Sequence, residues 1–332
     1  MNRLFQILLL GVGLTLFALI LGESDLDALS RSLGRIGVTG FAAVLLVFAL
    51  YFAADALSWH VTLLTAPLTA RWAWIMLRVR LIGEVYNNIT PTASLGGEPI
   101  KALILKTEHN IALSASGASL VIAKTTSMMT LVLFVLPGFY FLSLNAEIAE
   151  RYTGALSLSL VGLVVIVTLF FLTQWLRLSS RITVLLGGEG SAGRLARFVA
   201  GVESVDRAFI EFYGAHPARL FASVAFASLN WALGALELYV ILHVVGEPVS
   251  FAQAWGIECV VQLVRTATFF IPAGLGTQDG AMYLLTNLLT GNPVAGVAGA
   301  VVRRIRDLSW ISVGLLVVAF SAAASLGPQD NS

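Results

Sequence analysis

The chain has 332 residues, of which 58% are hydrophobic and only 12% are charged, and its formal net charge is +1. Soluble domains carry about 25% charged residues. The mean hydropathy is +0.87, and several runs approach the ~20 apolar residues that cross a bilayer as a helix. The composition excludes a soluble globular protein and predicts an all-α fold, a polytopic transmembrane helical bundle. A single cysteine excludes an intramolecular disulfide, and no basic cluster indicates a nucleic-acid partner.

Apolar runs taken in chain order predict the membrane spans. The first run lacks a convincing cleavage site, so we interpret it as a retained helix rather than a signal peptide. Three arginines make a span costly in the stretch 71–81, whereas Trp72 and Trp74 suit an interface, so we expect this segment at the membrane surface. We expect six to eight full spans from the runs 4–22, 36–57, 111–144, 155–175, 220–245, 251–270, 281–289 and 294–324.

The arginines also orient the chain. The polar segment 176–219 has an excess of arginine, which assigns it to the cytoplasm by the positive-inside rule. With Arg3 also inside, the predicted spans bring this segment to the same side. We therefore expect one integral membrane domain over residues 1–332, with a first half 1–175, the cytoplasmic segment 176–219 and a second half 220–326.

A polar motif at 84–101 interrupts the first half. Proline cannot continue a helix, and a glycine pair loosens it further. Free backbone polar groups cost several kcal/mol each in lipid, so broken helices occur against protein or a watery cavity. The motif therefore predicts a broken, re-entrant helix beside a polar interior. Its notable residues are Glu84, Asn87, Asn88, Pro91, Gly96, Gly97, Glu98 and Lys101.

A second motif at 265–280 repeats this plan. Aligning its proline with that of the first motif pairs residues of like position, namely Pro91 with Pro272, Glu84 with Arg265, Glu98 with Asp279, and Gly96 and Gly97 with Gly274 and Gly276. Three clear spans separate the motifs. If neither flanking segment crosses the membrane fully, this odd number places the motifs on opposite membrane faces. Two such hairpins are typical of an inverted-repeat transporter.

Ionisable side chains at membrane depth cost about 2.5–3.5 kcal/mol on insertion scales, so they are functional candidates. Others in apolar runs are Glu237, Glu258 and Arg306, and mutual pairing that only holds the bundle together is the competing interpretation. No spacing indicates a catalytic nucleophile or a metal site. The candidate substrate-binding residues are Glu84, Asn87, Asn88, Pro91, Gly96, Gly97, Glu98, Lys101, Lys124, Arg265, Pro272, Gly274, Gly276, Gln278, Asp279, Arg303, Arg304 and Asp307.

These residues carry a resemblance to a known family. The pattern N-x-x-P-x-x-x-x-G-G-E-P-x-K, the cation Lys124 in the next helix, I-P-A-G-L-G-T-Q-D-G and V-R-R-I-R-D-L resemble the flippase-like membrane family. That family includes the transmembrane region of lysylphosphatidylglycerol synthase and membrane proteins associated with hopanoid biosynthesis. The G-G-E-P-x-K and K-T forms are more similar to the hopanoid-associated branch.

The resemblance implies a lipid translocase in a bacterial cytoplasmic (inner) membrane. It would move a lipid, or a lipid-linked polar head group, between leaflets through a charged intramembrane cavity. We expect no enzyme activity, no cofactor and no nucleotide hydrolysis, since no Walker loop is present. The chain stops at Ser332 without the synthase's soluble domain, so we expect no lysine transfer. Expected partners are a membrane lipid substrate, lipid-synthesis enzymes and further copies in a homo-oligomer.

The expected mechanism gives the motif residues separate roles. Cations would bind an anionic head group, namely Lys124, Arg265, Arg303 and Arg304. Glu98 and Asp279 would hold these cations or titrate, and backbone amides near Gly97 and Gly276 would donate to the head group. Glu84, Asn87 and Asn88 would line the mouth of the cavity. A non-catalytic scaffold and an integral-membrane enzyme of a lipid-synthesis pathway remain the alternatives.

Overall fold

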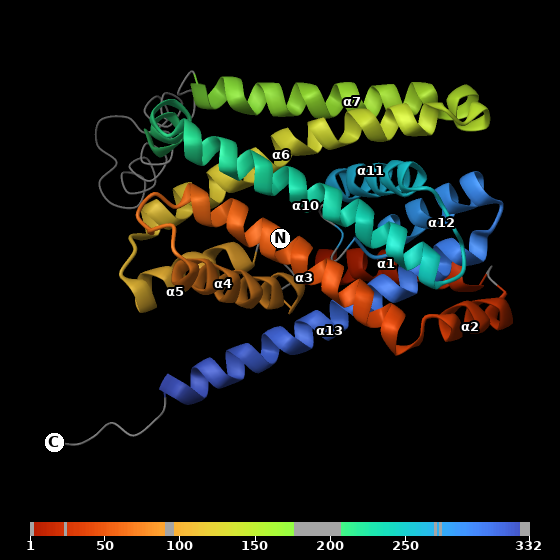
Figure 1. The fold of residues 1–332 in the computed structure, drawn as a ribbon, viewed down its shortest axis with the longest axis horizontal. Coiled ribbons are helices and arrows are strands. Elements are labelled where there is room, and N and C mark those ends of the chain that lie inside the picture. The colour runs from red at the N-terminus through yellow and green to blue at the C-terminus, as the bar shows by residue number, and fades with distance from the viewer. Residues whose placement is uncertain are drawn as a thin grey trace.

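The computed structural model describes residues 3–22, 25–89, 96–175, 207–268, 271 and 274–325. Within these ranges the chain is helical and contains no β-strand, which confirms the predicted all-α class. Residues 207–215 are helical. The other helices are α1 (Arg3–Gly22), α2 (Leu26–Arg35), α3 (Gly37–Thr62), α4 (Ala70–Ile89), α5 (Gly97–His109), α6 (Leu113–Ser143), α7 (Ala146–Trp175), α10 (Pro217–Val244), α11 (Phe251–Ala267), α12 (Thr277–Thr290) and α13 (Pro293–Ser325), as shown in Figure 1.

Three described helices, α3, α6 and α10, are long and apolar enough to cross a membrane. They coincide with the predicted runs 36–57, 111–144 and 220–245. The most extensive contact between described helices joins α3 and α10, which run side by side through the middle of the molecule (Figure 1). Polar side chains link their backbones: the Ser58 hydroxyl donates to the Ser223 carbonyl at 3.1 Å, and the Asn230 amide donates to the Tyr51 carbonyl at 2.9 Å.

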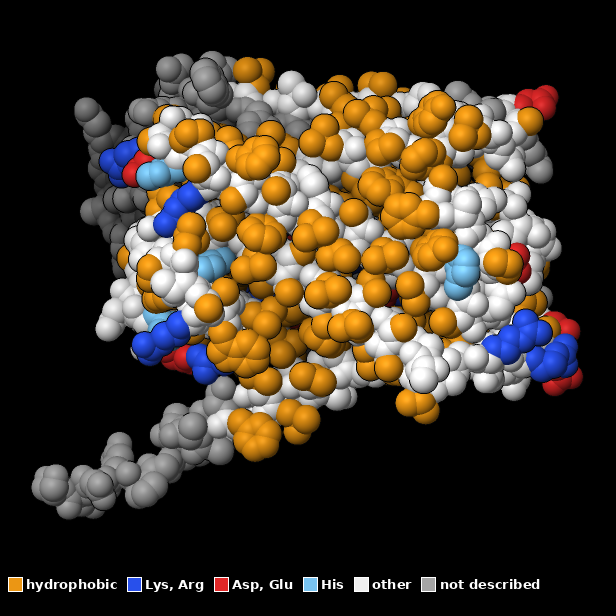
Figure 2. All heavy atoms as spheres, in the orientation of Figure 1, with side chains coloured by type: hydrophobic (Ala, Val, Ile, Leu, Met, Phe, Trp, Pro, Cys, Tyr) orange, Lys and Arg blue, Asp and Glu red, His pale blue; other side chains and the backbone are white. Residues whose placement is uncertain are grey.

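The exterior has the character of a lipid-facing surface. Figure 2 shows hydrophobic side chains across the middle of one face, with the charged side chains gathered toward its two ends. On the two central helices, Leu46, Leu50 and Phe221 are 63%, 51% and 76% exposed. Such a belt fits a bilayer, whose hydrocarbon core lies between two polar interfaces. The protein is therefore an integral membrane protein.

Helix α4 corrects one expectation. The stretch 71–81 is expected at the membrane surface, but it belongs to a helix packed against α3, α5 and α13. Met76 and Val79 on α4 are completely buried. The arginine count misleads because Arg80 points into the bundle, where it meets two carboxylates, Asp55 and Glu84. Opposite charges inside the protein offset a cost that lipid would not.

Each motif joins two helices that pack against each other, α4 with α5 and α11 with α12. Both motif acids fall in the first turn of the second helix, Glu98 on α5 and Asp279 on α12. The aligned positions therefore have matching places in the fold. The re-entrant insertion of the hairpins and their relation as an inverted repeat remain predictions. The prolines Pro91 and Pro272, and residues 176–206 of the expected cytoplasmic segment, lie outside the described residues.

Candidate functional site

A cavity of about 560 Å³ lies among the helices, within the length of the three candidate spans. Helices α3 to α6 and α10 to α13 all contribute to its lining. The lining combines aromatic and aliphatic side chains with seven acidic and seven basic ones. The acids are Asp55, Glu84, Glu98, Glu237, Glu258, Asp279 and Asp307, and the bases are Arg80, Lys101, Lys124, Arg265, Arg303, Arg304 and Arg306.

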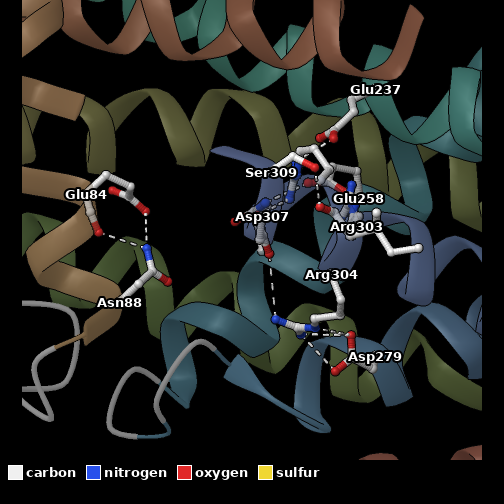
Figure 3. A network of polar contacts seen from close by, with 12 residues as sticks. Glu84, Asn88, Glu237, Glu258, Asp279, Arg303, Arg304, Asp307 and Ser309 are labelled. Carbon is white, nitrogen blue, oxygen red and sulfur yellow. Dashed lines mark hydrogen bonds and ion pairs between the residues drawn. The ribbon is translucent and has the colours of Figure 1, made fainter. Parts of the chain in front are cut away.

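Helix α13 supplies three of these arginines within four residues, and each reaches a different helix. Arg303 binds Glu258 of α11 at 2.5 Å. Arg304 binds Asp279 of α12 at 2.8 Å, and Arg306 pairs with Glu237 of α10. Asp307 of α13 accepts from Arg306 at 2.8 Å and lies 3.8 Å from Arg304, which links the Arg304 and Arg306 pairs to each other (Figure 3).

The sequence R-R-I-R-D explains this arrangement. Residues spaced by three lie on nearly the same face of a helix, whereas adjacent residues diverge by about 100°. Arg303 and Arg306 therefore point toward neighbouring partners on α11 and α10, and Arg304 turns toward α12. The acidic partners are almost completely buried, Glu237 at 3%, Glu258 at 2% and Asp279 at 2% exposed. Buried charges of this kind persist only when paired.

A second charged cluster belongs to the first motif. Arg80 of α4 is shared by two carboxylates, with Asp55 of α3 at 2.5 Å and Glu84 at 2.6 Å. Glu84 also accepts from Asn88 at 3.2 Å (Figure 3).

Aromatic rings of α3 lie against two cations of this part of the cavity, Arg80 and Lys101. The Arg80 guanidinium lies 4.6 Å from the centroid of the Phe52 ring, and the Lys101 ammonium lies 5.5 Å from that of Trp59. Lys101 also binds Glu98 at 2.8 Å, one turn away on α5. The ring faces add cation–π attraction to the ion pairs.

Two cations of the cavity have no such partner. Lys124 of α6 and Arg265 of α11 form neither an ion pair nor a hydrogen bond with any described residue, and both side chains are exposed in the lining. The other five cations hold all seven carboxylates of the cavity. Lys124 and Arg265 are therefore the positive groups that the cavity offers to a ligand.

The structure brings together most residues of the sequence-based site. Gly96, Gly97, Gly274 and Gly276 sit where the hairpin helices begin rather than in the lining, and the two prolines lie outside the described residues. Twelve of the eighteen candidates line the one cavity: Glu84, Asn87, Asn88, Glu98, Lys101, Lys124, Arg265, Gln278, Asp279, Arg303, Arg304 and Asp307.

Two of the expected amide donors are already bound within the protein. The backbone amides at Gly97 and Gly276 are expected to donate to a head group, but each donates to a side chain of its own motif. The Gly97 amide binds Asn87 Oδ1 at 2.7 Å, and the Gly276 amide binds Asp279 Oδ2 at 2.9 Å. The free amides of a helix start are satisfied by capping side chains. Asn87 and Asp279 thus shape the two hairpins.

The candidate substrate-binding set omits five charged residues of the cavity, Asp55, Arg80, Glu237, Glu258 and Arg306. Three of them were recognisable as charges in apolar runs, but hydrophobicity alone does not say which face of a fully apolar helix meets a cavity. Asp55 falls near the end of a predicted span, where a charge is ordinary. Arg80 was assigned to the surface segment. Both residues could be predicted from one rule. An acid in one span and a base in a neighbouring span are each costly in lipid, so they are expected to form an ion pair.

The lining holds no metal site among the residues that the structure describes, since no three His, Cys, Asp or Glu side chains converge there. The chemistry that these side chains offer is charge and hydrogen bonding.

Comparison with known proteins now decides the family. The profile described as the lysylphosphatidylglycerol synthase transmembrane region matches residues 5–316. The chain belongs to this family. The match spans both hairpins and all the cavity helices, which confirms the resemblance inferred from the motifs.

Two relatives carry the name UPF0104 membrane protein. The one from Methanothermobacter thermautotrophicus is 23% identical over 313 residues, which cover 91% of this chain and 90% of the relative. The one from Pyrococcus horikoshii is 21% identical over 289 residues, or 82% of this chain and 84% of the relative. No solved structure matches the chain. Membership of the lysylphosphatidylglycerol synthase transmembrane-region family points to a membrane protein of lipid metabolism.

Proposed function

We propose that this protein translocates a lipid with an anionic head group between bilayer leaflets. The observation that carries the proposal is the pair of unpartnered cations, Lys124 and Arg265, exposed in an intramembrane cavity whose carboxylates are all held by other cations. An unpaired cation at membrane depth costs about 2.5–3.5 kcal/mol. An anionic ligand would offset that cost, so the cavity favours such a ligand.

The rest of the lining supports a lipid rather than a small ion. Beside the charges lie Phe48, Leu120, Val121 and Met282, which suit the apolar part of an amphipathic molecule. The paired arginines of α13 would hold the helices around the head group rather than bind it. The protein would thus shield a charged head from hydrocarbon while acyl chains stay in contact with apolar surface.

The remaining expectations belong to this proposal. Translocation would proceed without nucleotide hydrolysis and without a reaction on the lipid. We place the protein in a bacterial cytoplasmic membrane, and the hopanoid-associated resemblance motivates that choice. A scaffold for lipid-synthesis enzymes would not need two free cations at membrane depth. An enzyme would need a reactive group beside the head group.

The test uses purified protein in liposomes with head-labelled lipids and a membrane-impermeant quencher. We expect exchange of an anionic lipid that Lys124→Gln or Arg265→Gln slows by about tenfold or more, because each removes a charge-assisted contact. The matched controls, Lys106→Gln and Arg31→Gln, neutralise exposed cations outside the cavity and are expected to exchange normally. Absence of exchange for every lipid would favour the scaffold or the enzyme. Normal exchange in both cavity variants would overturn the assignment.

A further inference from the structure

Tyr51 lines the cavity, and its hydroxyl forms no hydrogen bond with any residue in the part of the chain that the structure describes. Its ring is held firmly: it stacks on Phe48, with centroids 5.5 Å apart and planes 14° apart, and it passes close to Gly234 of α10. The backbone of Tyr51 is fixed by Asn230. Tyrosine hydroxyls inside proteins usually form a hydrogen bond. A fixed ring whose hydroxyl has no partner in the protein therefore indicates that a polar group of a ligand binds there.

The surroundings of this hydroxyl favour an anion. Arg265 lies within electrostatic range of Tyr51, as do Asp55, Arg80 and Glu258, and all four line the same cavity. Arg80 already holds Asp55, and Glu258 already binds Arg303. Arg265 is therefore the one of the four whose charge is not already bound to a described partner.

Lys124 reaches the same part of the cavity. It lines the cavity within electrostatic range of Asp55, which lies four residues after Tyr51 and so one turn along the same face of α3. Arg265 lies within the same kind of range of Glu84, the other carboxylate that shares Arg80. The two unpaired cations and the free hydroxyl thus face one region, beside the cluster around Arg80.

We propose that Tyr51, Arg265 and Lys124 together bind a phosphate monoester, which would make Tyr51 the residue that selects this head group. The inference rests on the proposed function and deepens it. A phosphate monoester carries about −1.5 to −2 charges at pH 7 and three acceptor oxygens. Two free cations and one neutral donor match that charge and that number of oxygens. A phosphodiester lipid, with one charge and two free oxygens, would leave one donor unused.

The site accepts the same chemistry from a lipid monophosphate or from free phosphate, so the test includes both. Binding to purified protein in nanodiscs would be measured for a polyprenyl phosphate, for inorganic phosphate as competitor, and for phosphatidylglycerol as the diester. Tyr51→Phe keeps the ring on Phe48 and removes only the hydroxyl. The control Tyr140→Phe removes a hydroxyl from a side chain that is 63% exposed outside the cavity.

We expect wild type to prefer the monoester over the diester by about tenfold or more, and Tyr51→Phe to lose about tenfold in monoester binding. Tyr140→Phe should bind as wild type does. If inorganic phosphate competes with the lipid, and competes less well in Tyr51→Phe, the site also binds the free ion. If only the polyprenyl phosphate binds tightly, the site is specific for the lipid. Equal monoester binding by Tyr51→Phe and wild type, or a diester bound as tightly as the monoester, would overturn the inference. Diester exchange that still depends on Lys124 and Arg265 would then leave the proposed function standing.

Discussion

Arg304 of α13 grips Asp279 of α12 through both carboxylate oxygens, each 2.8 Å from one guanidinium nitrogen. Asp279 also accepts a hydrogen bond from the backbone amide of Gly276, the residue that precedes α12. One carboxylate therefore caps α12 and also binds α13, so Asp279 holds these two helices of the cavity wall together.

The first prediction concerns the contact between Asp279 and Arg304. Asp279→Ala leaves Arg304 without its main partner and leaves the start of α12 uncapped. Loss of one member of a buried pair costs about 3–5 kcal/mol, so we expect a loss of that order in a detergent-unfolding titration. The matched control is Asp307→Ala, because that carboxylate is 36% exposed and only supplements Arg304 and Arg306. An equal effect of the two changes would contradict the assigned geometry.

The pair between Glu237 and Arg306 yields the second prediction. Arg306→Met strands the carboxylate of Glu237, and Glu237→Leu leaves Arg306 with only the exposed Asp307; both Glu237 and Arg306 are at least nine-tenths buried. The double variant removes both charges, so we expect it to be more stable than the less stable single variant and to show a coupling of about 0.5–3 kcal/mol. Unfolding titrations of the four proteins give the cycle. Additive losses would mean that the two side chains do not interact.

The third prediction tests how closely α4 and α5 approach. A Cβ atom on Gly97 would lie 2.0 Å from the Gly83 carbonyl oxygen, so Gly97→Ala must separate the two helices. We expect reduced stability and disturbed pairing of Glu98 with Lys101. Gly162→Ala in α7 has no atom within 4 Å of its new Cβ and is expected to be neutral or slightly stabilising. A wild-type melting temperature for Gly97→Ala would contradict the close approach of α4 and α5 at this position.

The fourth prediction separates binding from structure. Arg303→Ala with Arg304→Ala should abolish exchange and also lower stability, because it strands Glu258 and Asp279. Neutralising Lys124 and Arg265 should lower exchange without lowering stability, because neither has a partner to strand. Paired exchange and unfolding measurements on both double variants check this. Equal stability losses would show that the unpaired cations are structural.

Much of this architecture is predictable from the sequence. The apolar runs give α3, α6 and α10, and the acids of the two motifs fall in corresponding helix starts. The cations and carboxylates of the motifs do line one cavity. These features are predictable because hydrophobic length, proline and glycine act locally, within one or two turns.

What the sequence could not give is which charge pairs with which. Arg80 looks like a surface residue beside Arg78 and Trp74, and only the packing of α4 against α3 supplies Asp55. Likewise, Arg303 and Arg304 look as available for a ligand as Lys124. Their partners come from helices 45 and 25 residues away, and such distant pairing leaves no local pattern.

The most direct test of the central claim compares two double variants in the liposome assay. Lys124→Gln with Arg265→Gln neutralises the free cations of the cavity, while Lys106→Gln with Arg31→Gln removes the same charge from the exterior. The account predicts that anionic-lipid exchange falls at least about tenfold in the first protein and stays at the wild-type rate in the second. Wild-type exchange in the first protein, or equal losses in both, would contradict it.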